Sequence, residues 1–423
     1  MPEFKEDWSV LENAFKNPSL KMLSFTITEK GYATTTPDGN LMKEYDEDFK
    51  NPPEKAKMFL CRLTKLLFER FNAGKLPLAL VSMDNCSHNG EKLSSAIFKI
   101  AENWQKNGFV PREFVEYLKD ENKISFPWTM IDKITPRPNS KVAEMLKKDG
   151  FEETELIVTS QKTYCATFVN AEETQYLVVE DKFPNGRPTL EKAGVYFTDR
   201  ETVNKVEKMK VSTCLNPLHT ALALSGCLLG FNLICDEMKD SDLQKMVGIL
   251  GYKEGLPVVV DPKIINPKNF IDEVIKKRLP NPFMPDTPQR IATDTSQKLS
   301  VRFGETAKAY LADKNLDAAN LKIVPLVFAL WLRYLLAVDD NGNAFELSPD
   351  PLLPTLKNAL EGISLGENNA EKIEPKIKNL LENEKIFGFD VVSSPLYEKV
   401  KMYFMKMISG KGKVRETIHE AVS

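Results

Sequence analysis

The spacing of hydrophobic residues divides the chain into a first part that alternates strands with helices and a second part that is mainly helical. Apolar and polar residues alternate over 22–28, which predicts a strand, and a continuous apolar run over 78–83 has the length of a buried strand. Helical spacing covers 53–72 and 91–105. This order of strand, helix, strand and helix is typical of parallel α/β proteins.

Two more strand-like segments follow at 155–169 and 175–181, ahead of the turn sequence F-P-N-G-R-P. From about residue 202 onward the spacing is mainly helical. A chain of 423 residues exceeds what one hydrophobic core usually serves. We therefore predict an α/β domain over 1–200 and a mainly α-helical domain over 201–423.

Composition restricts the kind of partner. The chain is 42% hydrophobic and 28% charged, with a net charge of -3, so nothing points to nucleic acid or an anionic membrane. The apolar stretch 323–338 contains Arg333 and is too short to span a bilayer. The six cysteines include no C-x-x-C pair, which indicates reduced thiols of a cytoplasmic protein, and with only three histidines we expect no metal site.

The strongest candidate chemistry lies between residues 207 and 219, where the chain reads E-K-M-K-V-S-T-C-L-N-P-L-H. Lys210 can act as a general acid or base if burial brings its pKa down from about 10.4 toward roughly 7 to 8. Asn216 and His219 can hold a substrate oxygen whose charge changes. These residue types suit the interconversion of an alcohol and a ketone.

These groups can meet only if the helix that carries them breaks. On an unbroken helix, at about 100° per residue, Lys210 and His219 point to opposite sides. Pro217 supplies the break and makes Asn216 the expected N-cap of a helix over 217–230, with a neutral His219 in its first turn. The structural alternative is a capped helix with a buried, hydrogen-bonded histidine and a solvated lysine.

Five longer motifs occur in a specific order along the chain. They are T-I-T-E-K-G-Y (26–32), V-S-M-D-N-C-S-H-N-G (81–90), F-P-W-T-M-I-D-K-I-T-P (126–136), V-E-D-K-F-P-N-G-R-P (179–188) and P-Q-R-I-A-T-D-T-S-Q-K (288–298). With these motifs the chain resembles the long-chain polyol dehydrogenases, the family of mannitol 2-dehydrogenase and the fructuronate and tagaturonate reductases.

The resemblance implies a Rossmann-type domain that binds NAD or NADP, followed by a helical domain, with catalysis in the cleft between them and no metal. Lys210 resembles the acid/base lysine of the family. Asn216 and His219 resemble its substrate-oxygen clamp, and Glu207 resembles the acidic residue one helical turn before the lysine.

The remaining candidates bind substrate or cofactor. Arg290 and Lys298 match the spacing of a basic pair that contacts substrate oxygens, with solvated charges in a loop as the alternative interpretation. Asp84 and Asn85 follow a presumed strand and occupy the usual cofactor crevice, unless their loop is only a polar turn. The two further cofactor candidates are Glu180 and Asp181.

Three departures from the family pattern accompany the resemblance. The gap between Lys210 and Asn216 is one residue longer than in the members compared. Trp128 stands where mannitol dehydrogenases carry an asparagine, and Thr129 is the suggested substitute. No glycine-rich loop follows an early strand, so we expect an incomplete Rossmann-type domain, lacking an N-terminal part, that binds its cofactor weakly.

Two functional classes follow. The first is an NAD(P)-dependent oxidoreductase that interconverts a secondary alcohol and a ketone on an open-chain sugar alcohol or hexonate, such as mannitol and fructose or mannonate and fructuronate. The second is a cofactor-poor remnant that binds sugar or a partner without redox turnover. In either class we expect a small-molecule sugar alcohol or hexonate as ligand, and a monomer or weak homo-oligomer.

Overall fold

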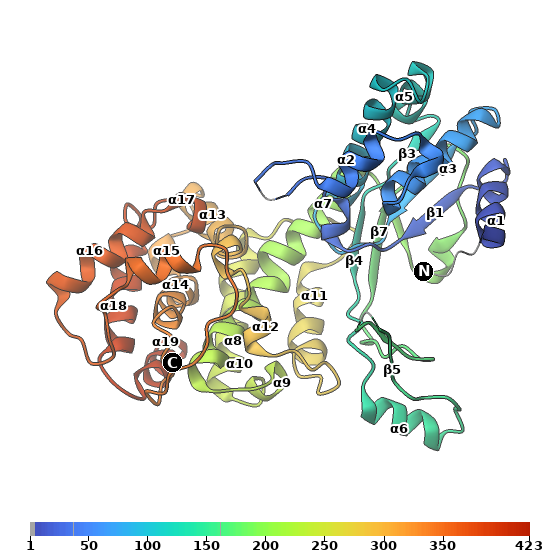
Figure 1. The fold of residues 1–423 in the computed structure, drawn as a ribbon. Helices are drawn as coiled ribbons and strands as arrows, with labels where there is room; N and C mark the ends of the chain where they lie inside the picture. Colours follow the sequence, from blue (N-terminus) through green and yellow to red (C-terminus); the bar gives the residue numbers. More distant parts are fainter. Residues whose placement is uncertain (1–4, 37, 161) are drawn as a thin grey trace. The chain divides into compact units, whose positions relative to one another are not determined.

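The computed structural model describes residues 5–36, 38–160 and 162–423. The chain divides into two compact units (Figure 1). One unit comprises Met1–Lys133 and Gln175–Glu207, and the other comprises Ile134–Thr174 and Lys208–Ser423. The division after Glu207 lies close to the boundary expected near residue 200. The sequence pattern gave no sign that 134–174 groups with the second unit.

The first unit is built on a three-stranded parallel sheet in the order β1-β2-β3. Its strands are β1 (Met22–Phe25), β2 (Leu78–Ser82) and β3 (Ile124–Ser125), and its helices are α1 (Lys5–Lys16), α2 (Lys43–Phe49), α3 (Phe59–Asn72), α4 (Asn89–Lys106) and α5 (Arg112–Lys119). Helices lie between successive strands along the chain, which confirms the predicted α/β class. Every residue of β2 is buried, as its continuous apolar run predicts.

Two predicted elements of this unit are shorter than the pattern suggested. β1 ends at Phe25, and shortly after it the amides of Ile27 and Thr28 donate to the Asp84 carboxylate instead of to a neighbouring strand. α3 begins only at Phe59, since consecutive prolines open a separate short 3-10 turn, Pro53–Lys55.

A buried arginine fastens the loops at one end of this sheet. Arg70, on α3, is 0% exposed. Its guanidinium donates to five backbone carbonyls, those of Phe15, Asn17, Leu20, Leu76 and Pro77. Because it has five N–H donors, one side chain satisfies several loop carbonyls that would otherwise be buried without partners.

A second three-stranded sheet has the order β4-β7-β8. Strand β4 (Thr129–Asp132) pairs antiparallel with β7 (Tyr176–Glu180), which pairs parallel with β8 (Tyr196–Thr198). The strand predicted over 175–181 is confirmed as β7. Ala79 and Val81 of the first sheet pack in one cluster with Val179 of the second.

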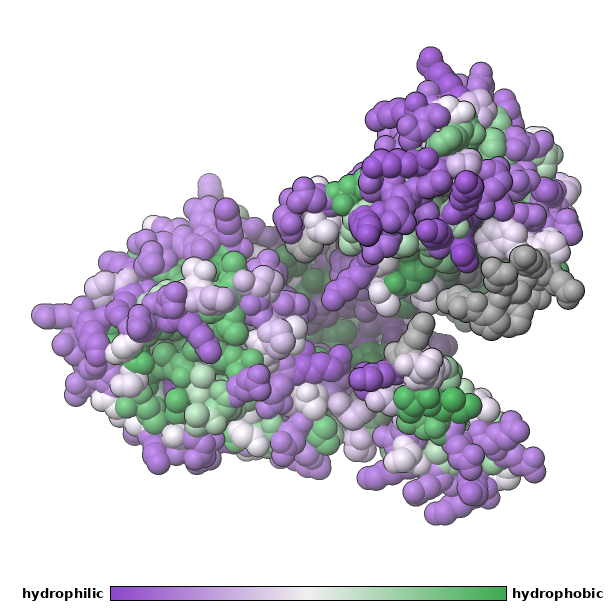
Figure 2. All heavy atoms as spheres, viewed as in Figure 1, coloured by the Kyte–Doolittle hydropathy of each residue, from purple (hydrophilic) through white to green (hydrophobic). Residues whose placement is uncertain are grey.

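Between β4 and β7 the chain makes the excursion 134–174, which contains α6 (Ser140–Lys148), β5 (Ile157–Val158) and β6 (Tyr164–Cys165). The strand expected over 155–169 was wrong in extent, because only this short hairpin forms. Figure 2 shows apolar side chains gathered on the surface of the excursion. The exposed ones are Met145, Phe151, Leu156, Ile157, Val158, Tyr164 and Val169.

The second unit is mainly helical, as predicted. Its helices are α8 (Asn216–Leu229), α9 (Ile234–Glu237), α10 (Ser241–Gly248), α11 (Pro267–Glu273), α12 (Pro288–Ile291), α13 (Glu305–Ala312), α14 (Ile323–Tyr334), α15 (Leu353–Ala359), α16 (Ala370–Leu381), α17 (Glu384–Phe387), α18 (Tyr397–Ile408) and α19 (Lys413–Val422). Every residue of α14 is buried, so the most hydrophobic stretch of the chain is the core helix that the sequence predicts. Within the described part of the chain, no helix has the length and apolar character needed to cross a membrane.

Candidate functional site

The segment that carries the strongest candidate residues is almost continuously helical. Helix α7 (Arg200–Met209) leads into a π-helical turn, Lys210–Cys214, and then into α8. The amide of Leu215 donates to the Lys210 carbonyl at 3.1 Å, five residues back. A π turn takes one more residue than an α turn. It therefore accommodates the residue by which the Lys210 to Asn216 gap exceeds the family spacing.

The helix breaks where Pro217 predicts it to break, but one residue earlier than expected. Leu215 has φ −127° and ψ −62° and is the N-cap of α8, without a side-chain cap. Asn216 is already helical, so the prediction that its side chain caps the helix was wrong. The side-chain amide of Asn216 therefore does not cap α8.

Lys210 is 3% exposed and occupies the first position of the π turn. Its burial excludes the solvated lysine of the structural alternative. His219 lies in the first turn of α8, as predicted, and its amide donates to the Leu215 carbonyl at 3.0 Å.

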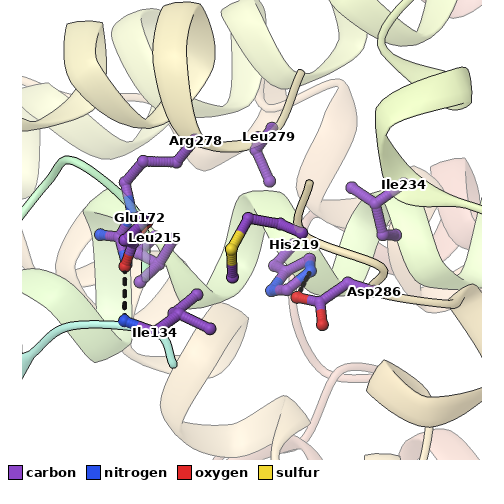
Figure 3. Close-up of a pocket in the computed structure, with 9 residues that line it drawn as sticks. Ile134, Glu172, Leu215, His219, Ile234, Arg278, Leu279 and Asp286 are labelled. Atoms are coloured by element: carbon purple, nitrogen blue, oxygen red, sulfur yellow. Dashed lines mark hydrogen bonds and ion pairs between the residues drawn. The ribbon is translucent and has the colours of Figure 1, made fainter. Parts of the chain in front are cut away.

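His219 has an acidic neighbour that the sequence did not reveal (Figure 3). Its Nε2 atom lies 3.5 Å from Oδ2 of Asp286, and the two side chains are 15% and 13% exposed. Burial lowers the pKa of His219, Asp286 opposes that shift, and the charge of Arg302 adds to it. The imidazole is thus neutral at neutral pH, as expected from its place at a helix N-terminus.

A small cavity of about 20 Å³ lies beside this pair (Figure 3). Its lining includes Leu215, Ile234 and Met284 together with His219 and Asp286. A space of this size holds about one water molecule. It is therefore part of the packing around the imidazole, because a six-carbon substrate needs a far larger volume.

The basic candidates lie on the chain that follows Asp286. Arg290, on α12, is 61% exposed and is ion-paired with Asp286. Lys298 is partly buried, and its Nζ atom donates to the carbonyls of Ile291 and Thr293. Burial, with help from the charge of Arg302, lowers the pKa of Lys298 to about 8.

Arg302 is a further cation of this stretch and was not predicted from the sequence. It lies one helical turn after Lys298, on the π turn Ser300–Gly304, and it donates to Oγ1 of Thr220, the residue after His219. Burial lowers the pKa of Arg302 to about 10. The spacing of four residues between Lys298 and Arg302 was the signal available in the sequence.

In the first unit, Asp84 organises the loops that follow β1 and β2. Its carboxylate accepts hydrogen bonds from the amides of Ile27, at 3.0 Å, and Thr28, at 2.8 Å, and from the hydroxyl of Tyr32. Both carboxylate oxygens are thereby engaged within the protein. The structure gives Asp84 a positioning role that joins the T-E-K-G-Y and D-N-C-S-H-N-G motifs.

The other acidic candidates of this unit are also engaged. Glu180 is 6% exposed and accepts from Nε of Arg200, while Asp181 accepts from Nε of Arg187 at 2.8 Å. Glu207 accepts a hydrogen bond from the hydroxyl of Ser87. Asn85 is exposed.

The motifs 81–90 and 126–136 pack against each other at the start of α4, through Asn89 and Gly90. The Asn89 amide donates to Oγ1 of Thr129 at 2.7 Å, and the Thr129 hydroxyl donates to the Ser82 carbonyl at 2.7 Å. A Cβ at Gly90 would lie 2.5 Å from the Phe126 carbonyl oxygen. The Thr129 hydroxyl is thus committed to the fold, which argues against it as the substitute for the missing asparagine.

A hollow of about 620 Å³ adjoins the loops after β1 and β2. Its lining combines the hydroxyl, imidazole and amine groups of Ser87, His88, Lys92 and Lys99 with the carboxylates of Glu29 and Glu91, and Lys92 is ion-paired with Glu29. Ligands of open α/β sheets bind outside the carboxyl ends of the strands. The position, size and polarity of this hollow therefore fit part of a dinucleotide.

The comparisons with known proteins agree with this architecture. Residues 3–192 match the family model described as the mannitol dehydrogenase Rossmann domain, and residues 202–407 match that of the mannitol dehydrogenase C-terminal domain. The chain is 52% identical over 418 residues to the D-mannonate oxidoreductase of Thermotoga maritima. The aligned region covers 98% of this chain and 77% of that protein.

Two solved structures are similar along the chain. The substrate-free form of a D-sorbitol dehydrogenase has a TM-score of 0.76 and 26% identity, and covers 99% of this chain and 78% of that one. The ternary complex of Pseudomonas fluorescens mannitol 2-dehydrogenase with NAD and D-mannitol has a TM-score of 0.65 and 25% identity, and covers 99% and 77%. These similarities confirm the predicted fold class and favour the oxidoreductase over the remnant.

Proposed function

The chain belongs to the mannitol dehydrogenase family and is an oxidoreductase of CH–OH groups, and we propose that it interconverts a secondary alcohol and a ketone on an open-chain hexonate. The observation that carries this proposal is the 52% identity to a D-mannonate oxidoreductase. The cations Lys298 and Arg302, one helical turn apart on the same stretch of chain, support an anionic substrate.

In this proposal each unit has a distinct task. The hollow of the first unit, with Ser87, His88, Lys92 and Lys99, holds a nicotinamide cofactor, which supplies the hydride acceptor when bound. We propose NAD as the cofactor, because a mannitol 2-dehydrogenase of similar fold has been solved with it. Titration with NADH and NADPH, followed by fluorescence, tests that choice.

The second unit handles the oxygen of the reacting carbon. Lys210, buried on the π turn, takes the hydroxyl proton during oxidation and returns it during reduction. Asn216 and the neutral His219 hold that oxygen by hydrogen bonds as its charge changes. Asp286 orients the imidazole, and Arg290 in turn neutralises Asp286.

Steady-state oxidation of mannonate and mannitol with each cofactor tests the function. We expect mannonate to have the higher kcat/KM, because the carboxylate finds cations that a neutral polyol does not use. A clear preference for mannitol would contradict the hexonate proposal and leave the family assignment standing. Failure to oxidise either compound would contradict the open-chain substrate class.

A further inference from the structure

Arg302 lacks the carboxylate partner that an arginine largely removed from solvent normally has. Its one side-chain hydrogen bond within the described residues goes to the Thr220 hydroxyl, and no carboxylate of that part of the chain pairs with it. The π turn that carries it packs against α8 and against the π turn of Lys210. The guanidinium is therefore held beside the first turn of α8, one residue from His219.

The neighbouring charges do not neutralise Arg302. Arg278 pairs with Glu172 at 2.8 Å, and Arg290 pairs with Asp286, so these two carboxylates already have cations, while the charges of Asp294 and Asp350 act on Lys298. Lys298 donates to backbone carbonyls. Withdrawing a cation from water without a partner is costly, so an anionic ligand at this position would be stabilised by it.

We propose that the Arg302 guanidinium binds the carboxylate of the substrate and thereby sets the preference for a hexonate over a neutral polyol. A planar guanidinium matches a carboxylate with two parallel hydrogen bonds, a geometry that a hydroxyl group does not offer. Thr220 fixes the orientation of the fork. The backbone amide of Arg302 donates to the Lys298 carbonyl at 2.9 Å, so the two residues lie one helical turn apart. Lys298 therefore contributes a second positive charge from the preceding turn.

This assignment changes the role expected of Arg290. The family resemblance pairs Arg290 with Lys298 as the basic groups that contact substrate oxygens. In the structure Arg290 is 61% exposed and already neutralised by Asp286, so its free charge is small. Arg302 and Lys298 are the better carboxylate partners, and Arg290 acts through Asp286 and His219.

The inference rests on the proposed function. A pair of isosteric substrates distinguishes a failure of the inference from a failure of the proposed function. Mannonate and mannonamide have the same carbon chain and differ in the charge of the terminal group. The experiment measures kcat/KM for both compounds with the wild-type protein, Arg302→Gln and Arg302→Lys. If mannonamide is not turned over, its inhibition constant against mannonate oxidation replaces its kcat/KM.

We expect Arg302→Gln to lower the preference for mannonate over mannonamide by about tenfold to a hundredfold, the contribution of hydrogen bonds to a charged group. The loss should fall mainly on the acid, and Arg302→Lys should restore part of it. Lys308→Gln removes an exposed charge on the following helix and is the matched control, so its preference should equal that of the wild type.

Three results would count against the inference. One is a wild-type protein that oxidises mannonate but does not distinguish it from the amide. Another is a preference that survives Arg302→Gln, and a third is an equal loss for both compounds, which indicates a structural role. Thermal melting identifies a variant that fails to fold, in which case Arg302→Lys alone decides. A wild-type protein inactive on both compounds contradicts the proposed function instead.

Discussion

Lys210 combines burial, a non-α turn and nearness to the break before α8, which together suit a proton-transfer group. Under the proposed function, Lys210→Ala should lower kcat by about two to four orders of magnitude, the usual contribution of general acid/base catalysis. Lys208→Ala removes an exposed lysine of the same segment and should leave the rate near that of the wild type. Steady-state kinetics on mannonate measure both. Equal rates for wild type and Lys210→Ala would remove Lys210 from the mechanism.

Glu237 is the most unusual single residue outside the site. It is 0% exposed, and neither carboxylate oxygen has a hydrogen-bond partner among the described residues. Burial, with a smaller effect of Asp240, raises the pKa of Glu237 well above its ordinary value. The side chain is thus held as a neutral acid against the backbone of Gly226.

Replacing that acid by an apolar chain of similar length should stabilise the protein. Glu237→Met removes a buried unsatisfied group, worth about 1 to 3 kcal/mol. Because the folded-state pKa is raised, the folded protein holds a proton that the unfolded chain loses above about pH 4.3, so the wild type loses stability as pH rises. The gain from Glu237→Met should therefore grow from pH 4 to pH 8.

Thermal melts across that pH range measure the effect. Glu346→Met, at an exposed glutamate, is the control and should change stability by no more than about 0.5 kcal/mol at any pH. A gain for Glu237→Met that stays constant with pH would indicate that Glu237 is not held protonated.

The site divides at the residue scale into what local sequence reveals and what it does not. Lys210, Asn216 and His219 lie within one short segment, so their spacing and Pro217 were enough to predict a shared helical break. Asp286 and Arg302 reach the same turn of α8 from distant parts of the chain. No local pattern records such contacts, because they depend on how helices pack.

At the scale of elements, the start of α4 depends on one glycine. A Cβ at Gly90 would lie 2.5 Å from the Phe126 carbonyl oxygen and 2.8 Å from Cδ1 of Trp128. Gly90→Ala must push the helix away from this segment, and it should lower the free energy of unfolding by about 1 to 3 kcal/mol. Gly248→Ala, where nothing lies within 4 Å, should be neutral or slightly stabilising.

Chemical denaturation of the two glycine variants gives the comparison directly. Equal denaturation midpoints for the two variants would mean that α4 accommodates the added methyl group without a loss of stability. The same contact explains why the H-N-G of one motif and the F-P-W-T of another occur together in this chain, a relation that neither motif reveals when considered alone.

The sequence predicted elements well where length and pattern agreed. β2 and α14 combine unbroken apolar runs with the lengths of a strand and a helix, and α4 has clear helical spacing. The two-residue strands β3 and β5 have no room for a period. The π turns use the same residue types as α-helix, so only the packing around them distinguishes the two.

At the scale of the molecule, one buried ion pair attaches the excursion 134–174 to the helical part of its unit. Arg278 donates to both carboxylate oxygens of Glu172, and the two side chains are 4% and 2% exposed. Arg278→Met removes the buried cation beside that carboxylate, which should cost about 3 to 5 kcal/mol. Differential scanning calorimetry measures the loss.

The adjacent pair provides the control. Lys277 and Glu173 are 55% and 84% exposed, so Lys277→Met should cost at most about 1 kcal/mol. Similar losses for Arg278→Met and Lys277→Met would show that the excursion is attached by its other contacts and that the buried pair matters little.

The excursion also has a consequence for biosynthesis. Glu172 leaves the ribosome 106 residues before Arg278, its partner. At about 5 to 20 residues per second, the carboxylate waits roughly 5 to 20 seconds for its cation. During that interval the exposed apolar residues of the excursion, among them Ile157 and Val169, accompany an unpaired charge on the nascent chain. While translation continues, the excursion therefore presents apolar surface that can make non-native contacts.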